Sequence, residues 1–179
     1  MPKYVAFLRA INLGGHNIKM EYLRSLFEQM GLSNVETFIA SGNVIFEAAS
    51  ADAQELERKI TTALQAALGY AVAGFVRTTA ELAEIARYEP FKDAGLDAGD
   101  STLYIAFLAS SPEDLGLHRL LALASEVNQF HANSREIYWL CRTCFSDSGF
   151  SGAQLEKALG MPSTIRNAST VKKIAQKYA

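Results

Sequence analysis

The residues best suited to chemistry lie in one stretch near the start of the chain, between an apolar segment and the next predicted helix. Glycines in such a stretch let backbone N–H groups approach an anion, while arginine offers a planar fork of donors that matches phosphate or carboxylate. The stretch therefore predicts an anion-binding loop. The candidate ligand-binding residues in it are Arg9, Asn12, Gly14, Gly15, Asn17 and Lys19.

A second interpretation of the same loop is purely structural. The loop matches neither the G-x-G-x-x-G pattern of dinucleotide-binding proteins nor the G-x-x-x-x-G-K-[ST] pattern of a P-loop. Gly14 and Gly15 could simply take positive φ in a strand-to-helix turn, with Asn12 and Asn17 bonding to their own backbone. The sequence leaves both interpretations open.

Ser41 and Asn43 form a second candidate site, in a predicted hairpin with its tight turn at Ser41-Gly42. A serine nucleophile needs a base to activate it, and no histidine or acid lies near Ser41 in the sequence. Ser41 is therefore better explained as a turn residue. No residue of the chain qualifies as a nucleophile, so the catalytic residues, if there are any, stay unassigned.

Arg166 and Asn167 form a third candidate site, just before the last predicted helix. Arg166 and the helix N-terminus could form the second half of an anion site, opposite Arg9. The simpler interpretation is that Ser169 or Thr170 caps the helix and that Asn167 is a turn residue.

Cysteines and histidines predict no metal site and no cofactor. Cys141 and Cys144 have no second pair, and their spacing within a predicted strand points them to opposite faces. The three histidines lack ligand spacing. Two cysteines in 179 residues, together with the short apolar start, predict a cytoplasmic protein with no membrane partner.

Charge is distributed unevenly although the net charge is only −2. All 19 acids lie between Glu21 and Glu156, so both ends of the chain are basic and acid-free. If the ends meet, they form a positive patch that attracts a phosphate or carboxylate. The favoured partner is therefore a small anionic ligand. Nucleic acid bound by the basic ends is the first alternative, and a non-catalytic scaffold that pairs with another protein is the second.

Hydrophobic periodicity predicts the element order β-α-β-β-α-β for the first ~77 residues, which is the order of a ferredoxin-like unit. Tyr104–Leu108 then repeats Tyr4–Leu8 with one conservative change, and the same order of elements follows. The predicted domains are residues 1–90 and 101–179, separated by a linker at 92–101. The second domain ends in an extra C-terminal helix at 169–178.

The first strand and its repeat are apolar at five successive positions, which predicts burial of both faces. Two halves of this kind favour one compact α+β body.

Three motifs resemble the bacterial family known as domain of unknown function 1697. They are Arg9-Ala-Ile-Asn-Leu-Gly-Gly-His-Asn17, Ser41-Gly-Asn-Val-Ile-Phe46 and Thr164-Ile-Arg-Asn-x-x-Thr-Val171. The resemblance implies a duplicated ferredoxin-like architecture and a cytoplasmic bacterial source, and it brings no established activity. The family usually has Gly at the position of Ala10 and often Trp at that of Ala168.

Overall fold

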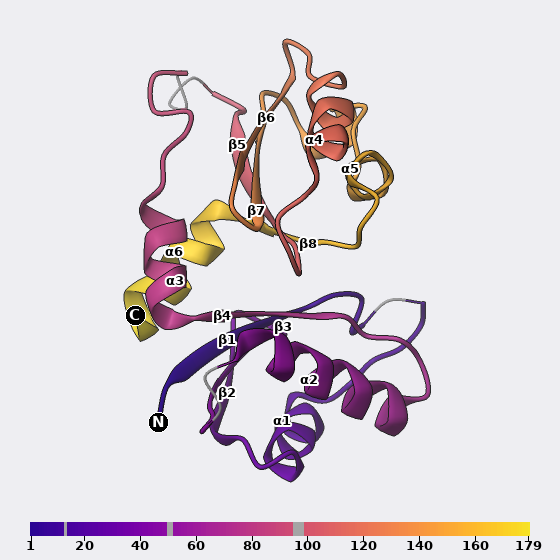
Figure 1. Cartoon of the computed structure of the whole chain (residues 1–179), viewed down its shortest axis with the longest axis vertical. Coiled ribbons are helices and arrows are strands. Elements are labelled where there is room, and N and C mark those ends of the chain that lie inside the picture. Colours follow the sequence, from indigo (N-terminus) through magenta and orange to yellow (C-terminus); the bar gives the residue numbers. More distant parts are fainter. Residues whose placement is uncertain (13, 50–51, 95–98) are drawn as a thin grey trace. The chain divides into compact units, whose positions relative to one another are not determined.

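The computed structural model describes residues 1–12, 14–49, 52–94 and 99–179 (Figure 1). The chain divides into two compact units. Unit 1 comprises Met1–Glu84 together with Ile174–Ala179, and unit 2 comprises Ile85–Lys173. Each unit contains its own four-stranded sheet.

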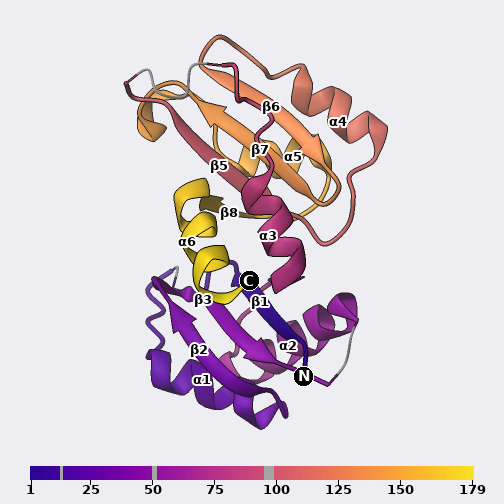
Figure 2. The same cartoon turned by 90° about the vertical axis from the view of Figure 1, so that its left-hand side faces the viewer.

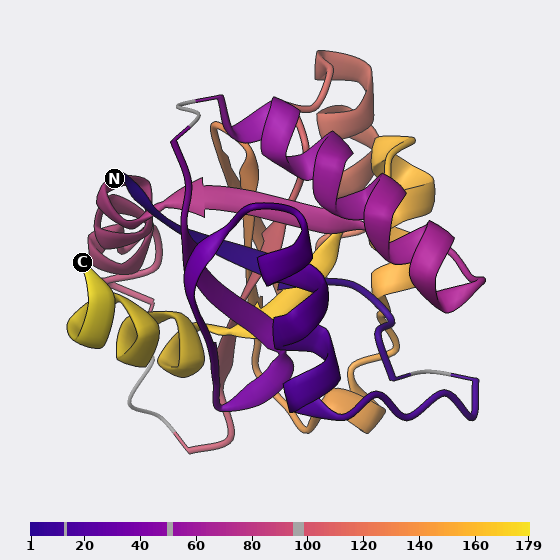
Figure 3. The ribbon, with the colours of Figure 1, turned by 90° about the horizontal axis from the view of Figure 1, so that it is seen from below.

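Unit 1 has its strands in the spatial order β2-β3-β1-β4, and every neighbouring pair is antiparallel. Its helices α1 and α2 lie against one face of this sheet (Figure 3). The elements are β1 Lys3–Leu8, α1 Met20–Gln29, β2 Ser33–Phe38, β3 Ala40–Glu47, α2 Ala53–Leu68 and β4 Gly74–Thr78. Helix α3, Thr79–Arg87, follows β4 directly, and the boundary between the units falls inside it.

Unit 2 repeats this arrangement with the strand order β6-β7-β5-β8. The elements are β5 Thr102–Phe107, α4 Asp114–Leu121, β6 Asn128–Asn133, β7 Glu136–Cys141, a 3₁₀ turn at Phe145–Asp147, α5 Gly152–Leu159 and β8 Thr164–Asn167. Helix α6, Ala168–Tyr178, follows β8 directly, and a boundary between the units falls inside it. The predicted α+β fold with duplicated ferredoxin-like halves is confirmed. The C-terminal helix α6 has a counterpart in α3, because each follows the last strand of its half.

The first strand is buried along its whole apolar run, as predicted. Tyr4, Ala6 and Leu8 belong to the core beneath α1 and α2, and Val5 and Phe7, which alternate with them, are also buried. In unit 2, Ile105, Ala106 and Phe107 of β5 are buried in the same way. The five-residue repeat therefore marks the central strand of each sheet.

Two local predictions were wrong. The hairpin between β2 and β3 turns at Ile39, which has φ +67°, whereas Ser41 and Gly42 already belong to β3. Asn167 was expected to be a turn residue, but it ends the edge strand β8, Thr164–Asn167, which pairs with β5. Both errors arise because tertiary pairing overrode local turn chemistry.

Candidate functional site

The Arg9–Lys19 loop begins as a continuation of the sheet. The N–H of Arg9 donates to the carbonyl of Ala73 at 2.8 Å, so pairing between β1 and β4 extends one residue past the end of β1. The next residue, Ala10, has φ +60°. A left-handed conformation is strained for a residue with a Cβ such as alanine, so glycine would fit this position better.

A hydrogen bond inside the loop and a tyrosine from outside it hold the loop in place. The Asn12 side-chain oxygen accepts from the N–H of Ile18 at 3.1 Å. The Tyr70 hydroxyl donates to the carbonyl of Ile11 at 2.8 Å, and its ring stacks on His16 with centroids 3.8 Å apart. The described part of the loop is therefore anchored at both its start and its middle.

The two glycines adopt the positive φ predicted for them, +68° at Gly14 and +83° at Gly15. Both are exposed, and no described atom lies within 4 Å of the place where a Cβ of Gly15 would be. The Asn12 bond agrees with the structural interpretation of the loop, while the open space at Gly15 leaves its backbone accessible.

Lys19 ends the loop at the N-cap of α1, where its side chain is exposed and makes no cap hydrogen bond. The N-terminus of a helix carries partial positive charge, which disfavours a lysine there, and Glu21 in the first turn of α1 provides a compensating negative charge. Arg9 is half-buried at the other end of the loop, and Asn17 is exposed between them. The loop thus places two cations and two glycines in one connection.

The loop is longer than its counterpart in unit 2. The connection from β1 to α1 covers residues 9–19, whereas the equivalent connection from β5 to α4 covers only 108–113. Because both connections join the same pair of elements, the shorter one shows how much chain the fold needs. The additional residues of the Arg9–Lys19 loop are therefore not required by the architecture.

The second candidate pair lies in the β2–β3 hairpin. Asn43 is buried, and its side-chain nitrogen donates to the carbonyl of Phe38 at 3.2 Å. This bond spans the turn at Ile39 and stabilises the hairpin. Ser41 lies in β3, three residues before the apolar end of that strand begins at Val44.

The third candidate pair lies at the end of β8. Arg166 donates to the Thr164 hydroxyl at 2.7 Å and to the carbonyl of Ile165 at 3.0 Å, and burial lowers its pKa to about 10. The Asn167 side-chain oxygen accepts from the N–H of Ser169 at 3.0 Å. Asn167 is therefore the capping residue of α6, in place of the expected Ser169 or Thr170. Arg9 and Arg166 belong to different units, and their convergence stays a prediction.

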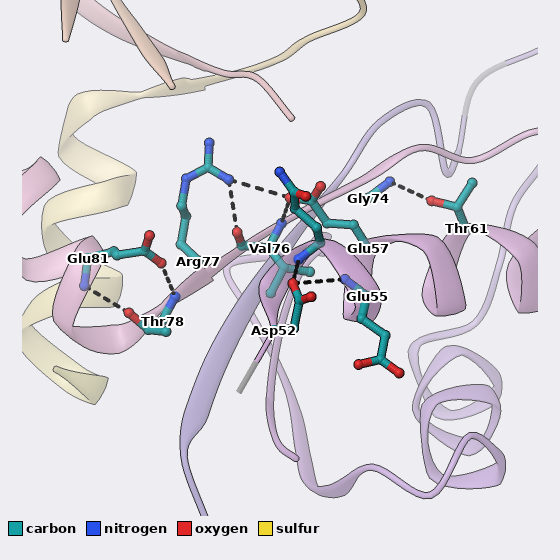
Figure 4. Close-up of polar contacts among 10 residues, drawn as sticks. Asp52, Glu55, Glu57, Thr61, Gly74, Val76, Arg77, Thr78 and Glu81 are labelled. Atoms are coloured by element: carbon teal, nitrogen blue, oxygen red, sulfur yellow. Dashed lines mark hydrogen bonds and ion pairs between the residues drawn. The ribbon is translucent and has the colours of Figure 1, made fainter. Parts of the chain in front are cut away.

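A buried ion pair in unit 1 was not predicted from the sequence. Arg77 of β4 is fully buried and lies 3.5 Å from the Glu57 carboxylate of α2 (Figure 4). The guanidinium also donates to the carbonyl of Val76 at 2.8 Å. Val5 pairs with Arg77 in unit 1, and Ile105 pairs with Arg166 in unit 2. The two arginines are thus equivalent in the duplication, and each precedes the cap of a helix.

The outer edge of β4 is covered by side-chain acceptors (Figure 4). On alternate residues of the strand, the N–H of Val76 donates to Glu57 at 2.8 Å, and that of Thr78 donates to Glu81 at 2.8 Å. The N–H of Gly74 donates to the Thr61 hydroxyl at 3.4 Å. These outward N–H groups are therefore already paired within unit 1.

The described part of the chain contains no cluster of side chains that could hold a metal ion. Within residues 1–12, 14–49, 52–94 and 99–179, no three His, Cys, Asp or Glu side chains gather closely enough to hold a metal ion. Cys141 is buried, Cys144 is exposed, and both are free thiols. None of the described helices is long and apolar enough to cross a membrane.

Comparisons with known proteins identify a similar solved structure and a family. The chain is 24% identical to the conserved bacterial protein SP0830 from Streptococcus pneumoniae, whose solved structure it matches with a TM-score of 0.72 over 99% of this chain and 98% of that one. This likeness shows a shared fold. No curated protein matches the chain. The model of the family described as "Protein of unknown function (DUF1697)" matches residues 1–138, and the chain therefore belongs to that family.

Proposed function

We propose that the protein binds a small phosphate- or carboxylate-bearing ligand at the Arg9–Lys19 loop. The observation that carries this proposal is the pair of exposed, left-handed glycines in the loop that leads to helix α1. Glycines in such a turn allow backbone N–H groups to point toward an anion outside the loop.

Charge supports the same conclusion. The loop carries Arg9 and Lys19 and contains no acidic residue. An arginine can hold a carboxylate or phosphate through two parallel hydrogen bonds, while a lysine adds a mobile point charge. The ligand class that fits both is a compact anion, and the role of the two side chains is to bind and orient it.

Anchoring of the loop also favours binding. Tyr70 and the bond between Asn12 and Ile18 fix the described part of the loop before any ligand arrives. A loop that is already ordered loses less conformational entropy on binding than a free one. A small anion can then bind through only a few contacts with the loop.

A thermal-shift titration tests the proposal, with inorganic phosphate and adenosine monophosphate as the probes. A ligand at about 100 times its Kd stabilises the folded state by ~2.7 kcal/mol, so the melting temperature rises measurably. We expect Arg9→Gln and Lys19→Gln to weaken this response. Lys59→Gln is the matched control, because Lys59 is an exposed cation on α2 of the same unit.

Equal responses from Lys19→Gln and Lys59→Gln would overturn the proposal, as would the lack of any response to either probe. Nucleic acid is the alternative ligand. A gel shift with single-stranded RNA whose affinity falls steeply with salt, in a protein that ignores both small anions, would support nucleic-acid binding instead.

A further inference from the structure

Helices α4 and α5 of unit 2 lie side by side on the same face of their sheet (Figures 1 and 2). They touch at Gly116, where an added Cβ would lie only 3.1 Å from the carbonyl oxygen of Leu159. Leu120 and Leu155 point from the two helices into the core of this unit. The absence of a side chain at Gly116 therefore allows α4 and the end of α5 to approach closely.

A hollow of about 500 Å³ opens beyond this contact. The lining residues are Arg119 and Leu123 on the α4 side and Gln154, Lys157 and Ala158 on the α5 side. Leu123 is 44% exposed, although it is a large apolar side chain. The hollow thus combines an accessible apolar surface with two cations from different helices.

Charge in this hollow has one sign. None of the described residues that line it is acidic, and Gln154 adds an amide that can donate to an anion. Arg119 also borders a smaller hollow of about 320 Å³, whose lining includes Glu113 together with Ser110 and Ser111. A negative group is therefore better accommodated beside Lys157 than on the Glu113 side of Arg119.

Size and surface chemistry together define the occupant. A volume of about 500 Å³ falls within the range of sites for small organic ligands. Leu123 and Ala158 suit a short alkyl chain or an aromatic ring, while Arg119 and Lys157 suit one carboxylate, sulfonate or phosphate. We propose that the groove between α4 and α5 binds a small anionic amphiphile, with its charged group between Arg119 and Lys157.

This site is independent of the Arg9–Lys19 loop, which belongs to unit 1. The test titrates the full chain with 8-anilinonaphthalene-1-sulfonate, an aromatic sulfonate. The fluorescence of this dye increases when it binds to an apolar surface. We expect saturable binding that octanoate displaces and acetate does not, because acetate has the charge without the apolar chain.

Two double variants locate the site. Arg119→Gln with Lys157→Gln removes both cations, and we expect affinity for the probe to fall about tenfold, since two charge-assisted contacts are lost. Lys172→Gln with Lys173→Gln removes two exposed cations from α6 and is expected to leave affinity unchanged. Near-ultraviolet circular dichroism of each variant checks that the fold is intact, because partly unfolded chains also bind this dye.

Equal losses in the two double variants would overturn the proposal, because they would reflect net charge alone. So would unchanged affinity in the Arg119–Lys157 variant. Displacement of the dye by an acidic amphipathic peptide but not by octanoate would also overturn it, and would identify the groove as a protein-docking surface.

Discussion

Arg77 of β4 and Arg166 of β8 occupy the same position in the two halves of the molecule, paired with Val5 and Ile105 respectively. Each guanidinium donates to the carbonyl of the preceding residue, at 2.8 Å for Arg77 and 3.0 Å for Arg166. Glu57 lies 3.5 Å from Arg77, whereas Thr164 supplies a hydroxyl to Arg166. The duplicated halves thus keep both the arginine and its hydrogen bond to the preceding carbonyl.

Replacement of Glu57 by Gln is expected to destabilise the protein strongly. The amide keeps an oxygen for the N–H of Val76 but leaves the buried charge of Arg77 without its acid. Breaking a buried ion pair from one side costs about 3 kcal/mol. Urea unfolding measures the loss. Glu28→Gln, on the exposed face of α1, is the control and is expected to change stability by less than about 0.5 kcal/mol.

Replacement of Ala10 by Gly is expected to stabilise the protein, although glycine usually has the opposite effect. Ala10 has φ +60°, and relief of this strain outweighs the extra chain entropy of glycine. We expect a gain of about 0.5–1 kcal/mol in the free energy of unfolding.

The control is Ala109→Gly in the equivalent connection of unit 2. Ala109 is not among the described residues with positive φ, so the same change there is expected to cost about 0.5–1 kcal/mol. A loss of stability in both variants would contradict the assignment of strain to Ala10.

The free energy of unfolding at alkaline pH is expected to depend on the buried hydroxyl of Tyr138. This hydroxyl donates to the carbonyl of Ile85 at 2.9 Å, and burial, reinforced by Glu136 and Tyr88, raises its pKa. An unfolded tyrosine ionises near pH 10 while the folded one keeps its proton, so the free energy of unfolding falls as pH rises above 10.

Tyr138→Phe removes this pH dependence, at a cost of about 1 kcal/mol at neutral pH from the lost hydrogen bond. We therefore expect the stability gap between wild type and Tyr138→Phe to narrow above pH 10. Tyr22→Phe, at a side chain that is 46% exposed, is expected to run parallel to wild type over the same range. A constant gap for Tyr138→Phe in urea titrations would contradict the prediction.

Removal of the Tyr70 hydroxyl is expected to loosen the Arg9–Lys19 loop without unfolding the chain. Tyr70→Phe keeps the ring that stacks on His16 but loses the bond to Ile11. We expect faster amide hydrogen exchange at Ile18, whose N–H donates to Asn12, and a loss of about 1 kcal/mol in stability. Tyr22→Phe again serves as the control, and equal exchange rates in both variants would show that Tyr70 does not anchor the loop.

The sequence was most informative where a local pattern decides the outcome. The apolar run Tyr4–Leu8 and its repeat predicted a buried central strand in each half, and consecutive glycines predicted positive φ at Gly14 and Gly15. Each of these features depends on the residue's own conformation or on its immediate periodicity. They could be predicted without knowing the partner strands.

The features that were not predicted from the sequence depend on pairing between strands. Residues 164–167 contain one large apolar side chain, Ile165, and become a strand because β5 pairs with them. Ile39 is a poor turn residue, so nothing local indicated that the hairpin turns there. One signal could have located the buried arginine. An aliphatic residue, an arginine and a capping residue precede a helix in both halves, at Val76-Arg77-Thr78 and at Ile165-Arg166-Asn167.

Covering the outer edge of β4 has a consequence for how a duplicated chain avoids misassembly. Two similar sheets on one polypeptide are present at an effective local concentration in roughly the millimolar range, which favours strand exchange between repeats. Glu57 and Glu81 accept hydrogen bonds from the N–H groups that a foreign strand would need. During synthesis, the first half can therefore fold without pairing its β4 edge with a strand of the second half.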